Sequence, residues 1–399
     1  MTTAGFVPAG LDRLQAVMAG HVESGAVPGL VWLVARGDEV HAGTAGTLEL
    51  ATGAPVERDS IFRISSMTKP VTAVAALVLV EECRVRLDDP VDDVLPELAD
   101  RRVLARPDGP LDDTVPAARP ITLRDLLTFR LGLGADFAAT YPQPSMTRAA
   151  ELGLGAGPPQ PALLPEPDEF MRRLGTLPLE YQPGERWLYH VGSQLLGVLV
   201  ARASGRSFPD FLAERVFGPL GMVDTGFAVP ADDLGRFGPC YWSDPDSGDR
   251  VVYDPADGQW SAPPAFPDGG AGLVSTVDDM AAFGAMLRGG GTYRGARVLS
   301  RASVAAMTAN RLTAEQIAAS GPHPSGALGW GFGVGVQLVQ TGPGRSVGGY
   351  GWEGGLGSSW ANDPAEDLTA LLLTNQAFTS PSGPAVVHDF WTLPYTALS

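Results

Sequence analysis

The sequence predicts an α/β fold of the α+β type, in which strands from both ends of the chain form one antiparallel sheet flanked by helices. Strand patterns occur near both termini, helical patterns fill the middle of the chain, and no repeat or low-complexity linker divides it. A length of 399 residues permits two domains or one domain with two lobes. We expect a single domain over 1–399, with a sheet lobe at about 1–85 and 325–399 and a mostly helical inserted lobe at about 86–324.

The first strands of the predicted sheet follow an opening helix. We expect this helix around 11–22, and we expect 30–47 to form a β-hairpin. Val31, Leu33 and Ala35 occupy alternate positions, as on one face of a strand, and Gly37-Asp38 supplies a turn.

The inserted part begins with an apolar helix, expected at 66–82, which is followed by the acidic, proline-containing break at 87–90. The segment 153–168 is rich in Gly and Pro and is expected to be an irregular surface loop. Further helices are expected at 123–129, 194–203, 208–217 and 277–288. Strands return near the end, where apolar residues alternate with glycine over 332–336 and 369–373 is an apolar run.

The charge balance argues against several classes of partner. The chain has 28 basic and 45 acidic residues and a formal net charge of −17, which repels nucleic acid and anionic membrane surfaces. The longest apolar run, 71–80, is too short to span a bilayer. The first residues show no basic region followed by an apolar core and a cleavage site, so we expect no secretory signal and a cytoplasmic location.

Metal and cofactor sites are not indicated. The five histidines do not fall at the spacing of metal ligands, and Cys83 and Cys240 make neither a zinc cluster nor a disulfide framework. We therefore expect no metal and no cofactor. Two free thiols fit a reduced cytoplasm better than the alternative, a single bridge.

One spacing indicates nucleophilic chemistry. Ser66 and Lys69 are three residues apart where the chain enters the expected apolar helix, so their side chains would share one face about one turn apart. Pro70 is tolerated there because the first turn of a helix has no intrahelical acceptors for its N–H groups. The helix dipole and the apolar run after Pro70 would lower the pKa of Lys69. A lysine with a lowered pKa can take the proton of a serine and activate it as a nucleophile.

A Ser-x-x-Lys spacing alone is a weak motif, and Lys69 could be an ordinary surface lysine. However, 27 of the 28 basic residues are arginine, so Lys69 is the only lysine in the chain. Arginine stays charged and cannot act as a base, which gives a reason for one lysine at this position.

At this point the sequence resembles a known superfamily, the penicillin-recognising serine hydrolases, which includes class C β-lactamases, D-alanyl-D-alanine peptidases, family VIII carboxylesterases and related acyltransferases. The resemblance covers nearly the whole chain and rests on the order and spacing of five segments: 62–69 (FRISSMTK), 120–127 (PITLRDLL), 183–189 (PGERWLY), 219–222 (PLGM) and 269–276 (GGAGLVST). It implies the serine β-lactamase and D-alanyl-D-alanine peptidase fold, with Ser66 as nucleophile and Lys69 as part of its base.

The resemblance also implies a second catalytic residue, Tyr189. A phenol beside a lysine can share a proton with it, and can serve as base in acylation and as acid toward the leaving group. The alternative is that Tyr189 is only an aromatic anchor. Two places later, where β-lactamases and peptidases have an amide-binding asparagine, this chain has Val191. His190 neighbours the expected site, and we assign it to the substrate-binding set in a supporting or surface position rather than a catalytic one.

A third element lines the pocket in these relatives. Where β-lactamases place the cation that binds the substrate carboxylate, the matching segment 351–357 (GWEGGLG) has Trp352, as in family VIII carboxylesterases. The resemblance implies that the backbone N–H groups of Ser66 and Gly355 form the oxyanion hole and that Trp352 and Gly354 contact the substrate. An aromatic, uncharged wall suits an apolar ester better than a β-lactam.

A rival motif lies near the C-terminus. Residues 344–348 (GRSVG) match Gly-x-Ser-x-Gly, and Asp363 and His388 follow Ser346 in the order typical of α/β-hydrolases. A nucleophile elbow needs a helix directly after the serine, whereas here the chain continues into glycines. We expect a loop that leads into the Trp352 strand.

The sequence thus predicts a serine hydrolase that forms an acyl-enzyme, with carboxylic ester hydrolysis of small to medium uncharged esters as the favoured activity. Acyl transfer through the same acyl-enzyme and amide hydrolysis of the β-lactamase or D-amino peptidase type are the alternatives within enzymes. A non-catalytic, penicillin-binding-like sensor module is the alternative from another class. The oligomeric state is not predicted.

Overall fold

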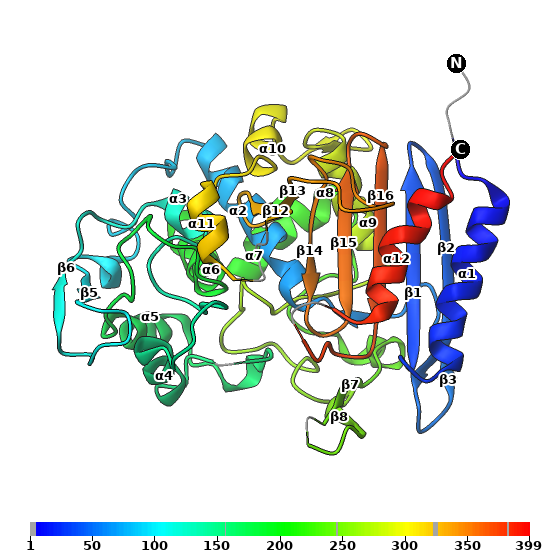
Figure 1. The fold of residues 1–399 in the computed structure, drawn as a ribbon, viewed down its shortest axis with the longest axis horizontal. Coiled ribbons are helices and arrows are strands. Elements are labelled where there is room, and N and C mark those ends of the chain that lie inside the picture. The colour runs from blue at the N-terminus through cyan, green and yellow to red at the C-terminus, as the bar shows by residue number, and fades with distance from the viewer. Residues whose placement is uncertain (1–4, 156, 245, 322–325, 381–382) are drawn as a thin grey trace.

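The computed structural model describes residues 5–155, 157–244, 246–321, 326–380 and 383–399. Within them, eight antiparallel strands form one sheet (Figure 1). Their order is β12 (Leu328–Trp330), β13 (Gly335–Gln337), β14 (Tyr350–Gly354), β15 (Ser358–Asp363), β16 (Leu368–Thr374), β1 (Gly29–Arg36), β2 (Glu39–Glu49) and β3 (Ala54–Pro55). Strand β1 pairs with β16, and Leu33 lies opposite Leu371. The prediction of one antiparallel sheet built from both termini is confirmed.

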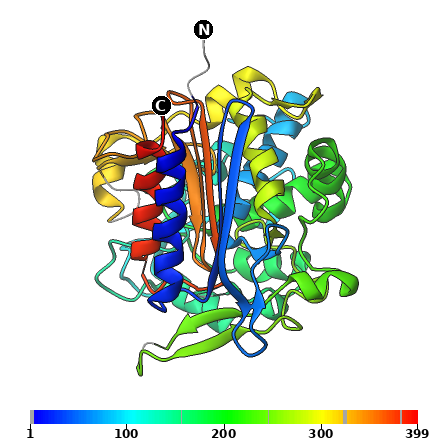
Figure 2. The ribbon, with the colours of Figure 1, turned by 90° about the vertical axis from the view of Figure 1, so that its right-hand side faces the viewer.

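The central strand β1 is buried on both faces because two helical layers cover the sheet. Val31 and Leu33 pack into the larger core with α9 (Val277–Arg288) and α2 (Thr68–Glu81). Trp32 and its alternate neighbours pack into a second core against α1 (Pro8–Glu23) and α12 (Ala385–Thr396). Figure 2 shows α1 and α12 together on one side of the sheet, with α9 on the other.

Most of the chain between β3 and β12 is helical or irregular, as expected from its patterns. Its remaining helices are α3 (Leu123–Leu127), α4 (Pro144–Glu151), α5 (Pro167–Gly175), α6 (Val191–Ser204), α7 (Phe208–Leu212), α8 (Gly218–Leu220), α10 (Arg301–Met307) and α11 (Ala314–Ala319). Four two-stranded ladders join β4 (Phe62–Arg63) to β9 (Val274–Ser275), β5 (Arg102–Leu104) to β6 (Thr114–Pro116), β7 (Cys240–Ser243) to β8 (Arg250–Asp254), and β10 (Thr292–Tyr293) to β11 (Ala296–Arg297). The division into two lobes stays a prediction.

Several predicted elements differ in the structure. The helix expected at 208–217 is α-helical only to Leu212, in α7, and continues as a π-helical turn over Ala213–Phe217. The helix expected at 66–82 begins with a 3₁₀ turn, Ser65–Met67, before α2, as helix N-termini often do. Of the strand expected over 332–336, only 335–336 are extended, in β13; residues 331–334 form a tight connection between β12 and β13, in which Gly333 adopts a positive φ of 71°. The loop expected at 153–168 contains a 3₁₀ turn at Pro161–Leu163, and part of it faces a cavity described below.

Both cysteines are free thiols, Cys83 exposed and Cys240 buried, as favoured from the sequence. In the described ranges no helix is both long enough and apolar enough to cross a membrane.

Candidate active site

The predicted nucleophile and lysine lie against each other at the start of α2. Ser66 sits in the 3₁₀ turn and Lys69 in the first turn of the helix that follows. Lys69 Nζ is 2.9 Å from Ser66 Oγ, and the lysine has no exposed surface. The apolar residues that follow Pro70 in α2 are also buried, so this end of the helix lies inside the protein.

Two further groups contact the amine of Lys69. Its Nζ donates to the carbonyl oxygen of Gly270 at 2.7 Å and lies 3.0 Å from Nδ1 of His190. Burial lowers the pKa of Lys69 to about 7, against a smaller opposing effect of the Asp268 carboxylate. At neutral pH a large share of the molecules therefore carries an uncharged amine beside Ser66.

Tyr189 completes the group around Lys69. Its backbone pairs with Ala135 through two hydrogen bonds of 2.8 and 3.0 Å, and its ring centroid lies 4.4 Å from Lys69 Nζ. Its phenol oxygen accepts a 2.7 Å hydrogen bond from Trp352 Nε1. Burial raises the pKa of Tyr189 to about 12, although hydrogen bonds with Ser66 and Trp352 act in the opposite direction. The phenol is therefore protonated at neutral pH and can donate a proton.

An aromatic cluster fixes the tyrosine and the tryptophan. Trp352 stands on β14, with its ring 5.8 Å from that of Tyr189 and 4.6 Å from that of Trp330, which it meets almost perpendicularly. Phe129 and Trp187 pack behind them. The edge-to-face contact with Trp330 favours one orientation of the Trp352 ring, so Trp352 presents an aromatic wall to the cavity, described below, that Ser66 also lines.

Gly355, expected in the oxyanion hole, and Gly354, expected to contact the substrate, occupy different positions. Gly355 lines the cavity, with no atom within 4 Å of the place where a Cβ would stand. Gly354 is buried against the backbone of Ile64, where a Cβ would clash with the carbonyl oxygen of Ile64. Gly354 thus lets β14 approach the nucleophile segment closely, and its contact with substrate stays a prediction.

The site opens into a cavity of about 880 Å³. Ser66, Tyr189, His190, Trp352 and Gly355 all line it. Most of its surface is apolar and comes from the helical part of the chain, including Leu133, Phe137, Met146, Leu154, Phe170 and Leu174. This volume lies toward the upper end for small-molecule sites.

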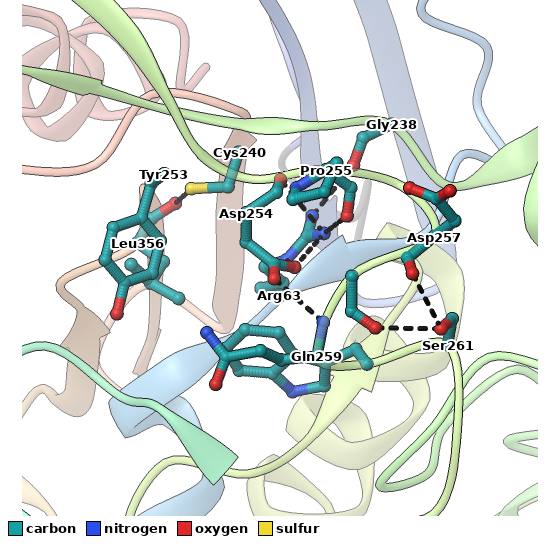
Figure 3. Close-up of polar contacts among 12 residues, drawn as sticks. Arg63, Gly238, Cys240, Tyr253, Asp254, Pro255, Asp257, Gln259, Ser261 and Leu356 are labelled. Carbon is teal, nitrogen blue, oxygen red and sulfur yellow. Dashed lines mark hydrogen bonds and ion pairs between the residues drawn. The ribbon is translucent and has the colours of Figure 1, made fainter. Parts of the chain in front are cut away.

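A buried ion pair anchors the strand that leads to Ser66 (Figure 3). Arg63 on β4 donates to Asp254 on β8 from Nε at 2.9 Å and from Nη2 at 2.5 Å, and to the carbonyl oxygen of Gly238 at 2.8 Å. Both ionic side chains are almost fully buried. From the other side, Ser358 Oγ donates to the carbonyl oxygen of Ile64 at 2.8 Å. The backbone just before the nucleophile is therefore held by two independent contacts.

Sequence reasoning missed two features of this site. It placed His190 beside the site but did not foresee its contact with Lys69. It did not single out Asp268, which is almost fully buried and accepts a 2.6 Å hydrogen bond from the Gly270 N–H. The sequence did offer a signal for Asp268, because this acidic residue directly precedes the recognised segment 269–276. Among the described residues, no cluster of three or more His, Cys, Asp or Glu is arranged to hold a metal ion.

The rival serine motif does not form a nucleophile elbow. No helix follows Ser346; the chain turns and enters β14 at Tyr350, as expected. Asp363 Oδ2 accepts a hydrogen bond from the backbone N–H of Ser346 at 2.7 Å, so the carboxylate caps a loop. His388 lies exposed on α12.

Comparison with known proteins adds independent findings. A model of the family described as Beta-lactamase matches residues 14–386. Protein Rv1367c of Mycobacterium tuberculosis is 39% identical over 373 residues, which cover 91% of this chain and 89% of that protein. Esterase EstB of Burkholderia gladioli is 32% identical over 404 residues, which cover 94% and 93% of the two chains. The solved structure of EstCE1, described as a hydrolase with promiscuous acyltransferase activity, matches with a TM-score of 0.78 at 24% identity and 98% coverage of both chains.

Proposed function

This chain belongs to the β-lactamase family of serine hydrolases, and we propose that within the family it is a carboxylesterase that forms an acyl-enzyme on Ser66. The observation that carries this proposal is the uncharged aromatic wall that Trp352 presents to a large apolar cavity beside the Ser66–Lys69 pair. The similarity to an esterase along almost the full length of both chains supports it.

The charges in the cavity also favour an uncharged substrate. Arg345 is a cation among the described lining residues, but it lies 3.8 Å from the carboxylate of Glu353 and stacks on the ring of Trp391 at 4.5 Å. A guanidinium engaged in this way is poorly placed to bind a substrate carboxylate. The sequence led us to expect small to medium ester substrates. A cavity of this volume would also accommodate bulky apolar esters.

In the proposed acylation step, the uncharged amine of Lys69 takes the proton from Ser66 Oγ as this oxygen attacks the ester carbonyl carbon. The N–H groups of Ser66 and Gly355 would hold the oxyanion of the tetrahedral intermediate. The C–O bond to the alcohol then breaks, and the leaving oxygen receives a proton from Tyr189, which regains one from the Lys69 ammonium. A water molecule then attacks the acyl-enzyme through the same proton transfers, with Ser66 Oγ as the leaving oxygen, and the carboxylic acid is released.

A panel of p-nitrophenyl esters with acyl chains from acetyl to dodecanoyl would test this proposal. We expect hydrolysis that Ser66→Ala abolishes, and Ser346→Ala, a substitution in the rival motif, is the matched control that should retain wild-type rates. Loss of activity in Ser346→Ala with an intact fold would contradict the proposal. A chromogenic cephalosporin in the same assay measures any β-lactam hydrolysis, and Ser66 labelling without turnover on any ester would favour the sensor alternative.

Acyl transfer is the second candidate, because the cavity has room for an acceptor beside the acyl group and the structurally similar EstCE1 is described as having such activity. In this reaction an alcohol or amine replaces water in deacylation. Product analysis with added alcohols would decide: transfer that exceeds hydrolysis at millimolar acceptor would favour it over the esterase. The cytoplasmic location remains part of the proposal.

A further inference from the structure

His190 occupies a strained backbone position between Tyr189 and α6. Its φ of 84° and ψ of −59° are unusual for a residue with a side chain, and the N–H of Val191 donates to the carbonyl oxygen of Tyr189 at 3.2 Å. These values define a γ-turn of the rare kind, which costs energy and is found where surrounding structure imposes it. The turn brings two consecutive side chains to one amine: the Tyr189 ring and His190 Nδ1 both lie against Lys69 Nζ.

The contacts of the imidazole assign its tautomer. Nε2 faces the carboxylate of Asp268, which can only accept, whereas the amine of Lys69 can donate to Nδ1, 3.0 Å away; Nδ1 is therefore the acceptor and carries no proton. The proton of a neutral ring then resides on Nε2, which faces Asp268 Oδ2 at 3.8 Å. Burial and the adjacent Lys69 charge lower the pKa of His190, which favours this neutral form despite the opposing effect of Asp268.

The two N–H groups of the uncharged Lys69 amine then fix the direction of its lone pair. An uncharged amine has two N–H donors and one lone pair. The carbonyl oxygen of Gly270 can only accept, and it takes one donor at 2.7 Å. His190 Nδ1 takes the second, so the lone pair is left facing the third neighbour, Ser66 Oγ, at 2.9 Å. Without an acceptor at His190, an N–H could turn toward Ser66 and the lone pair away from it.

We propose that His190 is a positioning residue: together with the Gly270 carbonyl, it holds both N–H groups of uncharged Lys69 so that the lone pair faces the Ser66 hydroxyl. The strained γ-turn places the imidazole for this purpose. This inference rests on the proposed acyl-enzyme at Ser66. It replaces the expectation that His190 belongs to the substrate-binding set, which its position on the cavity wall would also fit.

Two substitutions of His190 separate these roles. His190→Gly removes the acceptor and suits the positive φ, so the variant should fold with an unchanged or higher Tm. His190→Asn restores an acceptor, because Asn Oδ1 can stand near the place of Nδ1 and asparagine tolerates positive φ. The readouts are kcat and KM on a p-nitrophenyl ester, and the rate at which a fluorophosphonate labels Ser66, followed by intact mass.

We expect His190→Gly to lower both kcat and the labelling rate by about 10- to 100-fold, with KM within about threefold of wild type. His190→Asn should recover most of this loss. Wild-type labelling in His190→Gly, a loss confined to KM, or an Asn variant no better than the Gly variant would each overturn the inference. Because labelling needs no ester turnover, a chain that hydrolyses no ester but whose Ser66 labelling depends on His190 would refute the esterase function and support the positioning role.

Discussion

Replacing Lys69 with arginine removes the proposed base while keeping a positive charge. The pKa of Lys69 is about 7, so near neutral pH about half of the molecules carry an uncharged amine. A guanidinium has a pKa above about 12, so fewer than about one in 10⁵ molecules would carry the uncharged form. General-base catalysis contributes about 10²- to 10⁴-fold. We therefore expect Lys69→Arg to lower kcat/KM by about 10³-fold or more.

The size of arginine calls for a matched control, because Ser66, His190 and Gly270 enclose the amine at 2.7 to 3.0 Å. Lys69→Met removes the base without adding bulk or charge, and it should lose as much activity. The pH dependence of the stability of Lys69→Met provides a second test of the lowered Lys69 pKa. The pKa of Lys69 falls from 10.5 to about 7 on folding, so between these values the unfolded chain binds a proton that the folded chain lacks.

The contribution of Lys69 to the free energy of unfolding therefore rises with pH from about 7 to about 10.5, and its burial is most costly below that window. Relative to wild type, Lys69→Met should be most stable near pH 6 and should lose this advantage toward pH 9. The assays are ester hydrolysis under saturating and limiting substrate and thermal unfolding at both pH values. A folded Lys69→Arg enzyme with more than about a tenth of wild-type kcat/KM would refute the base assignment.

Three further predictions follow from the same contacts. Wild-type kcat/KM should rise with pH around an apparent pKa near 7 and then level off, because the deprotonated amine of Lys69 is the active form; a pH–rate profile in constant-ionic-strength buffer measures it. Trp352→Phe keeps the aromatic wall but removes the 2.7 Å hydrogen bond to the Tyr189 oxygen, so kcat should fall about 5- to 30-fold with little change in fold, as steady-state kinetics and circular dichroism would show. Arg63→Met leaves the Asp254 carboxylate buried without its partner and should lower the free energy of unfolding by about 3–5 kcal/mol in urea denaturation.

Each of these predictions has a contradicting outcome. A flat pH profile between about pH 6 and pH 9 would show that Lys69 does not titrate there. A Trp352→Phe variant with wild-type kcat would show that the hydrogen bond does not tune Tyr189. For the ion pair, Arg58→Met is the control, because its pair with Asp278 is exposed and worth less than about 1 kcal/mol; an equally small effect of Arg63→Met would contradict the anchoring role.

The parts of the fold that the sequence predicts well have regular periodicity. The hairpin at 30–47 and the helix α9 lie where alternation and helical spacing placed them, because local pattern and burial agree there. The pattern over 332–336 is correct only for 335–336, which lie in β13; over 332–334 the same alternation of apolar residues and glycine fits either a strand or a tight turn. The positive φ of Gly333 distinguishes the turn from a strand, and this backbone angle cannot be read from the residue types.

Some contacts of the candidate site are likewise predictable from the sequence, and others are not. Ser66 and Lys69 are three residues apart, so helix geometry alone predicts their contact, whereas Tyr189 and Trp352 were placed by resemblance to a family. The contact of His190 with Lys69 depends on a γ-turn and on a loop more than a hundred residues distant in sequence. Such pairings arise from tertiary packing, which single-sequence patterns do not encode.

Identifying the serine that becomes acylated tests the proposed acyl-enzyme on Ser66. Wild-type protein is mixed rapidly with a p-nitrophenyl ester, quenched in acid, weighed as intact protein and mapped by peptide mass spectrometry. We predict one acyl adduct on the peptide that contains Ser66, absent from Ser66→Ala and retained in Ser346→Ala. Ester turnover with the adduct on Ser346, or an adduct that persists in Ser66→Ala, would contradict it.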